Sequence, residues 1–178
     1  MNDQKFYFRR FLDSDANDDE FYFAFVNHAI ENIQPYFWGP SVVSPRDKFM
    51  KGACEYSHKV HHPPFIADAI DNKLFGVYHM TFRNANRYHQ LSLHLWDKFH
   101  LVEPILKQII NQTFSRERLD DCLLMEIPEF LLDQKVAAES LGLRCVGTFP
   151  RFLCHGRKYY DKYFYYITAR EWYLKPKD

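Results

Sequence analysis

The order of two hydrophobic patterns along the chain is the feature that most constrains its fold. Apolar residues that recur every three or four positions indicate helices, and runs rich in β-branched and aromatic residues indicate strands. These patterns predict helices over about 16–34, after Ser44, over 102–114 and over about 129–141. They predict strands over 5–12, 64–70, 74–82, 88–96, 122–127, 144–153 and 162–169. The predicted order is therefore β-α-α-β-β-β-α-β-α-β-β.

The ends of the predicted helices carry residues that usually start or stop a helix. Pro35 ends the first helix, and Ser44 with Pro45 begins the second. Pro104 lies in the first turn of the third helix, and Gly142 follows the fourth at the C′ position. No internal repeat and no Gly/Ser-rich linker interrupts the sequence, so a single domain over residues 1–178 is predicted.

The composition is that of a globular chain with many aromatic residues. The 178 residues suffice for one full-sized domain, and 47% hydrophobic with 26% charged residues exclude a disordered or fibrous class. The 23 basic residues balance 23 acidic ones, so no net field attracts nucleic acid or an anionic membrane. Aromatic residues make up 18%, more than such a core usually holds. Some are expected to line a groove or a partner face, which leaves a homodimer open.

The cellular compartment is predicted from what the chain contains. Its apolar runs fall far short of the roughly 20 residues that cross a bilayer, and the first residues do not form a secretion signal. The four cysteines lack C-x-x-C spacing, which is typical of reduced thiols. We therefore expect a cytoplasmic protein without disulfides.

Several common site types are not indicated. The sequence contains no G-x-S-x-G, Walker, H-E-x-x-H or Rossmann motif. No residue pattern therefore supports a hydrolase, nucleotide triphosphatase or dehydrogenase function. His58, His61 and His62 form an H-x-x-H-H cluster, but no cysteine or carboxylate stands at zinc-finger spacing, so no metal is predicted. The basic patches at 9–10 and 151–162 are interpreted as solvated faces, and nucleic acid is not expected.

Four residues are candidates for chemistry. His94 lies in the predicted strand 88–96, and the ordinary histidine pKa of about 6.5 suits a general base. Glu126 lies in an otherwise apolar strand, where a carboxylate needs either a partner or a function. Tyr160 could supply a phenolic proton, and His79 a substrate contact. For each of them a purely structural role is the competing interpretation.

Two stretches resemble known family motifs. Residues 137–148, AAESLGLRCVGT, resemble the segment of the GNAT N-acetyltransferase superfamily in which the last helix ends in Leu-Gly-Phe. Residues 156–161, GRKYYD, are similar to the Gly-x-Tyr-x-Asp turn between the last two strands of the ribosomal-protein acetyltransferase branch. With the order of elements, the whole chain resembles a divergent GNAT member nearest that branch.

This resemblance implies a fold and an activity. The fold would be α+β (α/β), with a mixed, mostly antiparallel seven-stranded sheet and about four helices. The activity would be N-acyl transfer, most simply N-acetyl transfer, from acetyl-CoA as co-substrate to a small-molecule or protein amine. His94, Glu126 and Tyr160 would then be the catalytic residues.

The resemblance also implies where the substrates bind. The thioester would lie along 88–96, with the pantetheine between this strand and 122–127. In the family a glycine-rich loop and a helix N-terminus hold the pyrophosphate, whereas residues 96–102 here contain no glycine. The expected coenzyme-binding residues are Leu95, Trp96, Lys98, His100, Leu101 and Val102. Phe37 and Trp38, between the first two helices, would shape the acceptor site together with His79.

Other departures from the family keep a second function open. The tyrosine that protonates the departing thiolate in many members falls on Ala138. The Asn-x-x-Ser pair of another branch falls on Leu131 and Gln134. The alternative is a protein of this fold that has lost coenzyme binding and acts as a protein-interaction module, for example in a phage.

Overall fold

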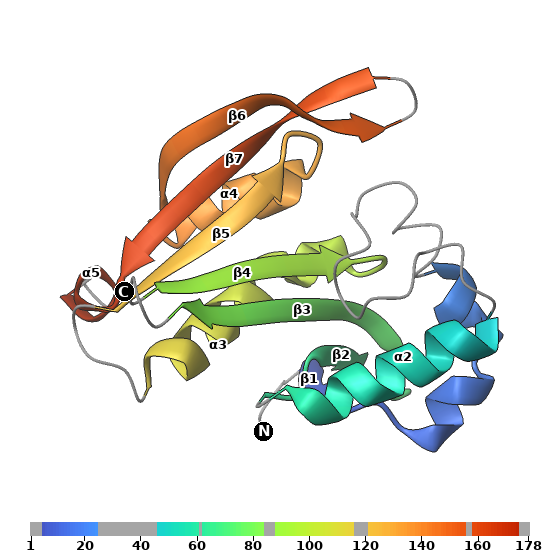
Figure 1. Ribbon diagram of the computed structural model, residues 1–178. Coiled ribbons are helices and arrows are strands. Elements are labelled where there is room, and N and C mark those ends of the chain that lie inside the picture. Colours follow the sequence, from blue (N-terminus) through green and yellow to red (C-terminus); the bar gives the residue numbers. More distant parts are fainter. Residues whose placement is uncertain are drawn as a thin grey trace. The chain divides into compact units, whose positions relative to one another are not determined.

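The computed structural model describes residues 5–24, 46–60, 62–83, 88–115, 121–155 and 158–174 (Figure 1). Seven strands form one sheet in the order β1-β2-β3-β4-β5-β7-β6. The chain divides into two compact units, residues 1–78 with 93–97 and residues 79–92 with 98–178. Strands β3 (Leu74–Arg83) and β4 (Tyr88–Leu95) each contribute residues to both units.

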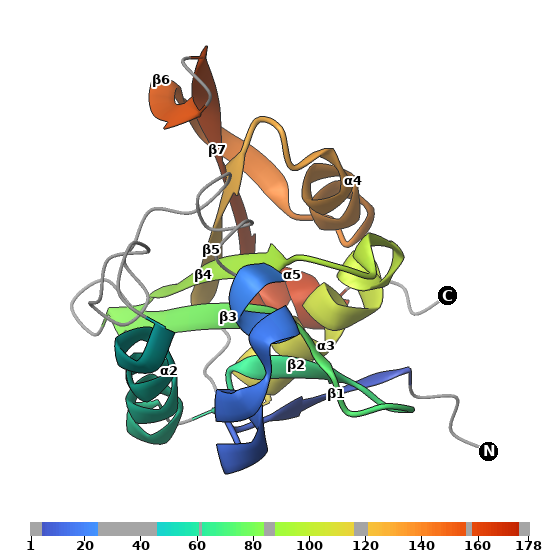
Figure 2. The ribbon, with the colours of Figure 1, turned by 90° about the vertical axis from the view of Figure 1, so that its right-hand side faces the viewer.

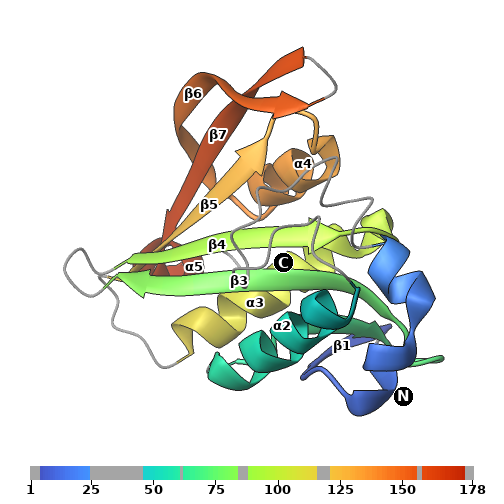
Figure 3. The same ribbon diagram turned by 45° about the vertical axis from the view of Figure 1, so that its right-hand side comes forward.

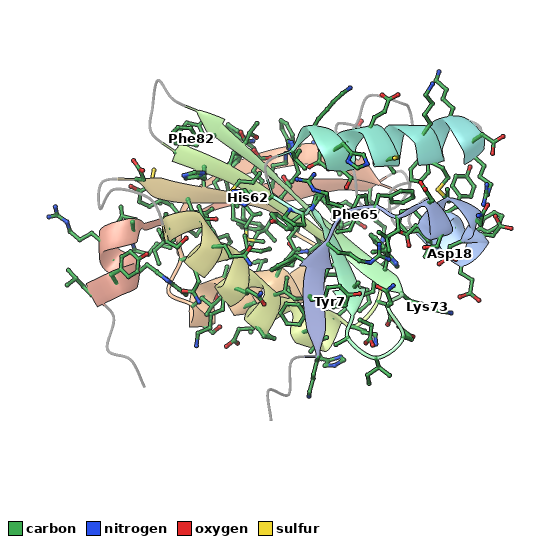
Figure 4. All side chains as sticks on the ribbon, turned by 90° about the horizontal axis from the view of Figure 1, so that it is seen from below. Tyr7, Asp18, His62, Phe65, Lys73 and Phe82 are labelled. Atoms are coloured by element: carbon green, nitrogen blue, oxygen red, sulfur yellow. The ribbon has the colours of Figure 1, made fainter. Side chains whose placement is uncertain are left out.

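The first unit is built around antiparallel strands. Strand β1 (Phe6–Arg9) pairs with β2 (Phe65–Asp68), which pairs in turn with β3 through Phe65↔Val77. The ring of Phe65, labelled in Figure 4, lies 5.4 Å from that of Phe11 and 6.1 Å from that of Phe21. Because β2 is buried along its whole length, its FIAD sequence carries apolar residues at successive positions and not only at alternate ones.

Two helical segments and a short 3₁₀ turn, η1 (Asp13–Asn17), complete the first unit. Residues 19–24 are helical, and the Asp18 carboxylate accepts a hydrogen bond from the Phe21 N–H at 3.0 Å, an N-cap. Helix α2 spans Arg46–Lys59 and buries one face against the phenylalanine core. Beside it, Arg9 holds Asp15 through two hydrogen bonds of 2.6 and 2.7 Å.

The second unit contains the remaining strands. Strand β5 (Cys122–Pro128) pairs in parallel with β4 and in antiparallel with β7 (Lys158–Thr168). Strand β6 (Arg144–His155) pairs with β7 and forms the edge of the sheet (Figure 3). The helical elements are η2 (Phe99–Leu101), α3 (Val102–Phe114), α4 (Leu132–Ser140) and α5 (Ala169–Leu174).

The helices of the second unit follow from their apolar spacing and their ends. Helix α3 buries residues three and four apart, Val102, Ile105, Leu106, Ile109, Ile110 and Phe114. It packs against α4 (Figure 2), where the Ser140 hydroxyl donates to Glu103 at 3.0 Å. Helix α4 ends at Ser140 and is followed by Gly142, whose φ of 71° lets the Leu143 N–H reach the Ala138 carbonyl at 2.8 Å.

The predicted seven-stranded fold is confirmed, with corrections to several boundaries. The first helix begins at 19 and not at about 16, because a 3₁₀ turn precedes it. Helix α4 begins at Leu132 and not at 129. Strand β7 begins four residues before the predicted 162, at Lys158. Residues 25–45, which include the predicted helix end at Pro35 and the start at Ser44, lie outside the described residues.

Helix α5 was not predicted. Thr168 is its N-cap: its hydroxyl accepts the Glu171 N–H at 3.0 Å, and the Glu171 carboxylate accepts the Thr168 N–H at 2.9 Å. This reciprocal pair is a capping box, and the T-x-x-E spacing that marks it is readable in the sequence. No helix in the described ranges is long and apolar enough to cross a membrane.

Candidate functional site

The parallel pairing of β4 and β5 stops before β5 does. Its register comprises four pairs, from Tyr88↔Cys122 to Leu91↔Met125. Strand β5 continues to Pro128 in antiparallel register with β7. The predicted acyl-transfer chemistry depends on these two strands not being paired along their whole length, and this chemistry stays a prediction.

The turn after β4 has a backbone conformation that normally favours glycine. Lys98 has φ 55° and ψ 41°, in the left-handed region. Its carbonyl accepts the Leu101 N–H at 2.8 Å, and the chain then enters η2 and α3. Neither Lys98 nor Leu101, the N-cap residues of η2 and α3, makes a side-chain capping hydrogen bond. The left-handed turn thus exists without glycine.

The start of α3 is where the sequence predicts the coenzyme phosphates. The first N–H groups of a helix and its dipole favour an anion at the N-terminus. Lys98 adds a positive charge at the turn, and His100, which is exposed, adds two ring nitrogens. The N–H groups of Leu101 and Val102 donate to the carbonyls of Lys98 and Phe99, so the turn offers an anion the Lys98 and His100 side chains and the helix dipole. Coenzyme binding at this turn stays a prediction.

The other predicted coenzyme-binding residues use their side chains in packing. Leu95, Leu101 and Val102 are buried, and the N–H groups of Leu101 and Val102 donate to the carbonyls of Lys98 and Phe99. The Trp96 indole N–H donates to the Leu74 carbonyl at 3.2 Å, and its ring lies 5.7 Å from that of Phe21. Leu95 and Trp96 belong to the first unit, whereas residues 98–102 belong to the second.

Glu126 has the partner that a carboxylate in an apolar strand needs. The Lys162 ammonium group donates to its Oε2 at 2.7 Å, and the Gln90 amide donates to its Oε1. The Lys162 and Glu126 side chains are 15% and 18% exposed. Sequence reasoning missed Lys162, although the need of Glu126 for a cation was a signal for some basic partner.

An aromatic ring completes the surroundings of Lys162. Its Nζ lies 4.4 Å from the ring centroid of Phe152, within the range of a cation–π interaction. The Phe152 ring stacks on Phe149 at 5.7 Å, and Phe149 contacts Phe164 at 4.9 Å. Glu126, Gln90, Lys162 and Phe152 are called the ammonium cluster below.

The two predicted histidines differ in position and environment. His94 is a buried residue of β4 in the first unit. His79 lies in β3 in the second unit, and burial lowers the pKa of its imidazole. His79 is therefore neutral at pH 7, a form that can both donate and accept a hydrogen bond.

Tyr160 lies on β7, in the same unit as Glu126. Its ring packs edge-to-face on that of Phe130 at 5.1 Å. Tyr160, Lys162 and Phe164 are two residues apart along the strand and so share a face of the sheet. The catalytic roles of His94, Glu126 and Tyr160 stay predictions.

Some predicted site residues are outside the described part of the chain. These are Phe37 and Trp38, the predicted acceptor contacts, and His61 of the histidine cluster. Among the residues that the structure describes, no group of three or more His, Cys, Asp or Glu side chains is arranged to hold a metal.

The excess of aromatic residues is partly explained by β6. Nine consecutive residues, 144–152, are exposed, among them Phe149 at 55% and Phe152 at 47%. These aromatic side chains lie outside the core, and the expectation that some aromatics line a groove or a partner face stays a prediction. The homodimer stays a prediction.

Comparison by sequence finds no relative. No protein-family model matches the chain, and no curated protein matches it significantly.

Comparison by structure finds similar folds over nearly the whole chain. The spermidine N-acetyltransferase SpeG from Vibrio cholerae, solved with CoA and spermine, matches with a TM-score of 0.72 and 12% identity over 96% of this chain and 99% of that one. An acetyltransferase of the GNAT family from Bacillus anthracis matches with a TM-score of 0.68 and 13% identity over 94% and 97%. At this identity the likeness concerns the fold, and the predicted nearness to the ribosomal-protein branch is not confirmed. The chain has the fold of the GNAT N-acetyltransferases.

Proposed function

We propose that the protein is an acetyl-CoA-dependent N-acetyltransferase that acts on an amine. The observation that carries the proposal is the likeness to N-acetyltransferases over nearly the full length of both chains, one of them solved with CoA. The turn at Lys98 supports it, because a cationic side chain beside the positive end of a helix dipole suits the phosphates of a coenzyme. Fold alone does not fix activity, so the proposal rests on both.

Each part of the proposed site has a role. Bound acetyl-CoA would supply an acetyl group activated as a thioester. Lys98 and His100 would bind the phosphates with their side chains, supported by the positive end of the helix dipole, and Leu95, Trp96, Leu101 and Val102 would lie along the rest of the coenzyme.

Three residues would handle the acceptor and the protons. An amine is nucleophilic only after it loses its ammonium proton, and His94 is the proposed base that takes it at a ring nitrogen. Glu126 would bind the ammonium form of the acceptor through its carboxylate. The Tyr160 phenol would donate the proton that the leaving group requires.

The acceptor is proposed to be a small aliphatic amine. One structural neighbour is solved with spermine, and the described residues include a carboxylate and an aromatic ring already arranged around an ammonium group. The predicted acceptor contacts Phe37, Trp38 and His79 remain part of this proposal.

Binding of the coenzyme is the first test. We expect acetyl-CoA and CoA to give heat in titration calorimetry and to raise the melting temperature, because a ligand that binds only the native state stabilises it. Lys98→Ala should weaken binding of the coenzyme by about three- to tenfold, because one charge-assisted contact is lost. Lys107→Ala, the same substitution at an exposed position within α3, is the matched control and should bind normally.

Activity is the second test. Purified protein is incubated with acetyl-CoA and a series of amines (spermidine, a shorter diamine, an arylalkylamine and a peptide N-terminus), and the released thiol is measured. Turnover with any amine supports the proposal. Absence of both heat and stabilisation at millimolar acetyl-CoA would overturn it and favour the interaction module.

A further inference from the structure

The environment of Lys162 is unusual for a lysine. Its ammonium group is held by the Glu126 carboxylate at 2.7 Å and by the face of the Phe152 ring at 4.4 Å, and its side chain is only 15% exposed. Lys59 and Lys73 also form ion pairs, but their side chains are 76% and 60% exposed. Lysine ammonium groups normally stay in water. Within the ammonium cluster, Glu126 and Phe152 therefore hold the Lys162 ammonium group largely removed from solvent.

The strands fix the carboxylate in place. Glu126 lies opposite Phe164 in the β5–β7 register, and Lys162 is one same-face step further along β7. From β4, the Gln90 amide donates to the second oxygen of the carboxylate. Both oxygens are thus oriented by neighbouring strands before any external ligand arrives, which lowers the entropic cost of binding a cation.

Ion pairs that are largely removed from water contribute little net stability in general. Replacing a buried ion pair by apolar residues of similar volume is often neutral or stabilising. A preformed carboxylate with an aromatic face is, however, a common way to bind an ammonium ion. An external primary ammonium ion has the same charge and the same N–H donors as the Lys162 Nζ.

We propose that Glu126, Gln90 and Phe152 form a binding site for an aliphatic primary ammonium ion, which Lys162 of the same chain fills until an acceptor amine displaces it. The use of this site by the acceptor rests on the proposed function; the site itself does not. Lys162 is then an internal competitor that lowers the affinity for amines. A tethered group competes at an effective concentration of the order of millimolar, so only amines that make further contacts would bind.

The test removes the competitor and supplies a free ammonium ion. Lys162→Ala leaves the Glu126 carboxylate without its cation and should lower the melting temperature. n-Butylammonium, added at millimolar concentration, should restore the melting temperature of this variant. By titration calorimetry it should bind the variant at least tenfold more tightly than the natural protein.

Controls separate the site from general salt or alkyl effects. n-Butanol, which has the same chain and no charge, should have no such effect. The double variant Glu126→Gln/Lys162→Ala should not respond to butylammonium. Should Lys162→Ala fail to fold, Lys162→Met removes the charge and keeps the apolar stem, and its response to butylammonium should again require Glu126.

Two results would overturn the inference. One is equal binding of butylammonium by the natural protein and by the folded Lys162 variant; the other is a response that persists in the double variant. Because no arm contains coenzyme, these outcomes are independent of acetyl-CoA binding. Acetyl transfer without ammonium binding would contradict this inference alone, and ammonium binding without acetyl-CoA binding would contradict the proposed function alone.

Discussion

Gly76 of β3 and Leu95 of β4 approach so closely that a side chain at Gly76 has no room. A Cβ atom built on Gly76 would stand 2.5 Å from Cδ2 of Leu95 and 3.1 Å from the main-chain oxygen of His94. Leu95 could shift its terminal methyl group, but the carbonyl oxygen belongs to the strand backbone. The glycine therefore permits the close approach of the two strands beside the predicted base.

The first prediction concerns this contact. Gly76→Ala should lower the free energy of unfolding by about 1–3 kcal/mol, the usual cost of overpacking. Gly147→Ala is the matched control, because a Cβ there meets nothing within 4 Å. It should change stability by less than about 0.5 kcal/mol. Urea denaturation of both variants measures the difference; equal losses would contradict the packing argument.

The second prediction concerns the left-handed backbone at Lys98. Glycine adopts this conformation without the steric cost of a Cβ, about 1 kcal/mol or more, but loses more entropy on folding. Lys98→Gly should therefore leave stability unchanged or raise it by up to about 1 kcal/mol. It should still weaken coenzyme binding, because the charge is lost.

The control for this prediction is the same substitution within a helix. Lys107→Gly, in the interior of α3, should cost about 1 kcal/mol through helix propensity. Chemical denaturation of the two glycine variants side by side gives the comparison. A larger loss at Lys98 than at Lys107 would show that the turn does not have the left-handed conformation.

The third prediction concerns alkaline pH. Burial raises the pKa of the Tyr56 and Tyr78 phenols well above the ordinary value of about 10. In the unfolded chain these phenols ionise near pH 10, whereas in the folded protein they stay protonated. The unfolded state thus binds fewer protons above pH 10, and stability falls as the pH rises.

The size of this effect can be stated for one tyrosine. At pH 11 each buried phenol should reduce the free energy of unfolding by about 1.4 kcal/mol relative to pH 9. Tyr56→Phe and Tyr78→Phe should each make the loss in the free energy of unfolding between pH 9 and pH 11 smaller by about 1.4 kcal/mol. Tyr159→Phe, at a residue that is 57% exposed, serves as the control and should leave the slope unchanged.

The fourth prediction concerns His94 as the proposed base. His94→Gln should lower kcat by about 10²- to 10⁴-fold, the usual range for a general base, and should leave the affinity for acetyl-CoA within about twofold. His89→Gln is a matched control, because His89 lies in the same strand and both histidines are 7% exposed. Steady-state kinetics and calorimetry read the two parameters separately.

Comparable losses of kcat in the His94 and His89 variants would indicate that both substitutions act by disturbing packing and that His94 is not the base. A fall in coenzyme affinity with unchanged kcat would show that His94 contributes to binding of the coenzyme and not to proton transfer.

Much of the fold could be predicted because its signals are local. The spacing of Ile105, Ile109 and their neighbours marks α3 within a few turns of chain, and Gly142 marks the end of α4. The capping box from Thr168 to Glu171 was equally local, but it followed a strong strand pattern and was overlooked. Local signals of this kind fix the type and order of elements.

The candidate site was less predictable, because its geometry depends on residues far apart. Glu126 and Lys162 are 36 positions apart, and only the β5–β7 register brings their charges within 2.7 Å. The left-handed conformation of Lys98 could not be predicted either, because the sequence has no glycine there, the residue that usually adopts this conformation.

By itself, then, the sequence determined the succession of strands and helices, because hydrophobic period and capping act between near neighbours in the chain. The tertiary structure alone decided which cation neutralises Glu126 and which backbone conformation precedes α3. Both are set by strand register and by packing, which minimise the free energy of the whole fold and leave no trace in short stretches of sequence.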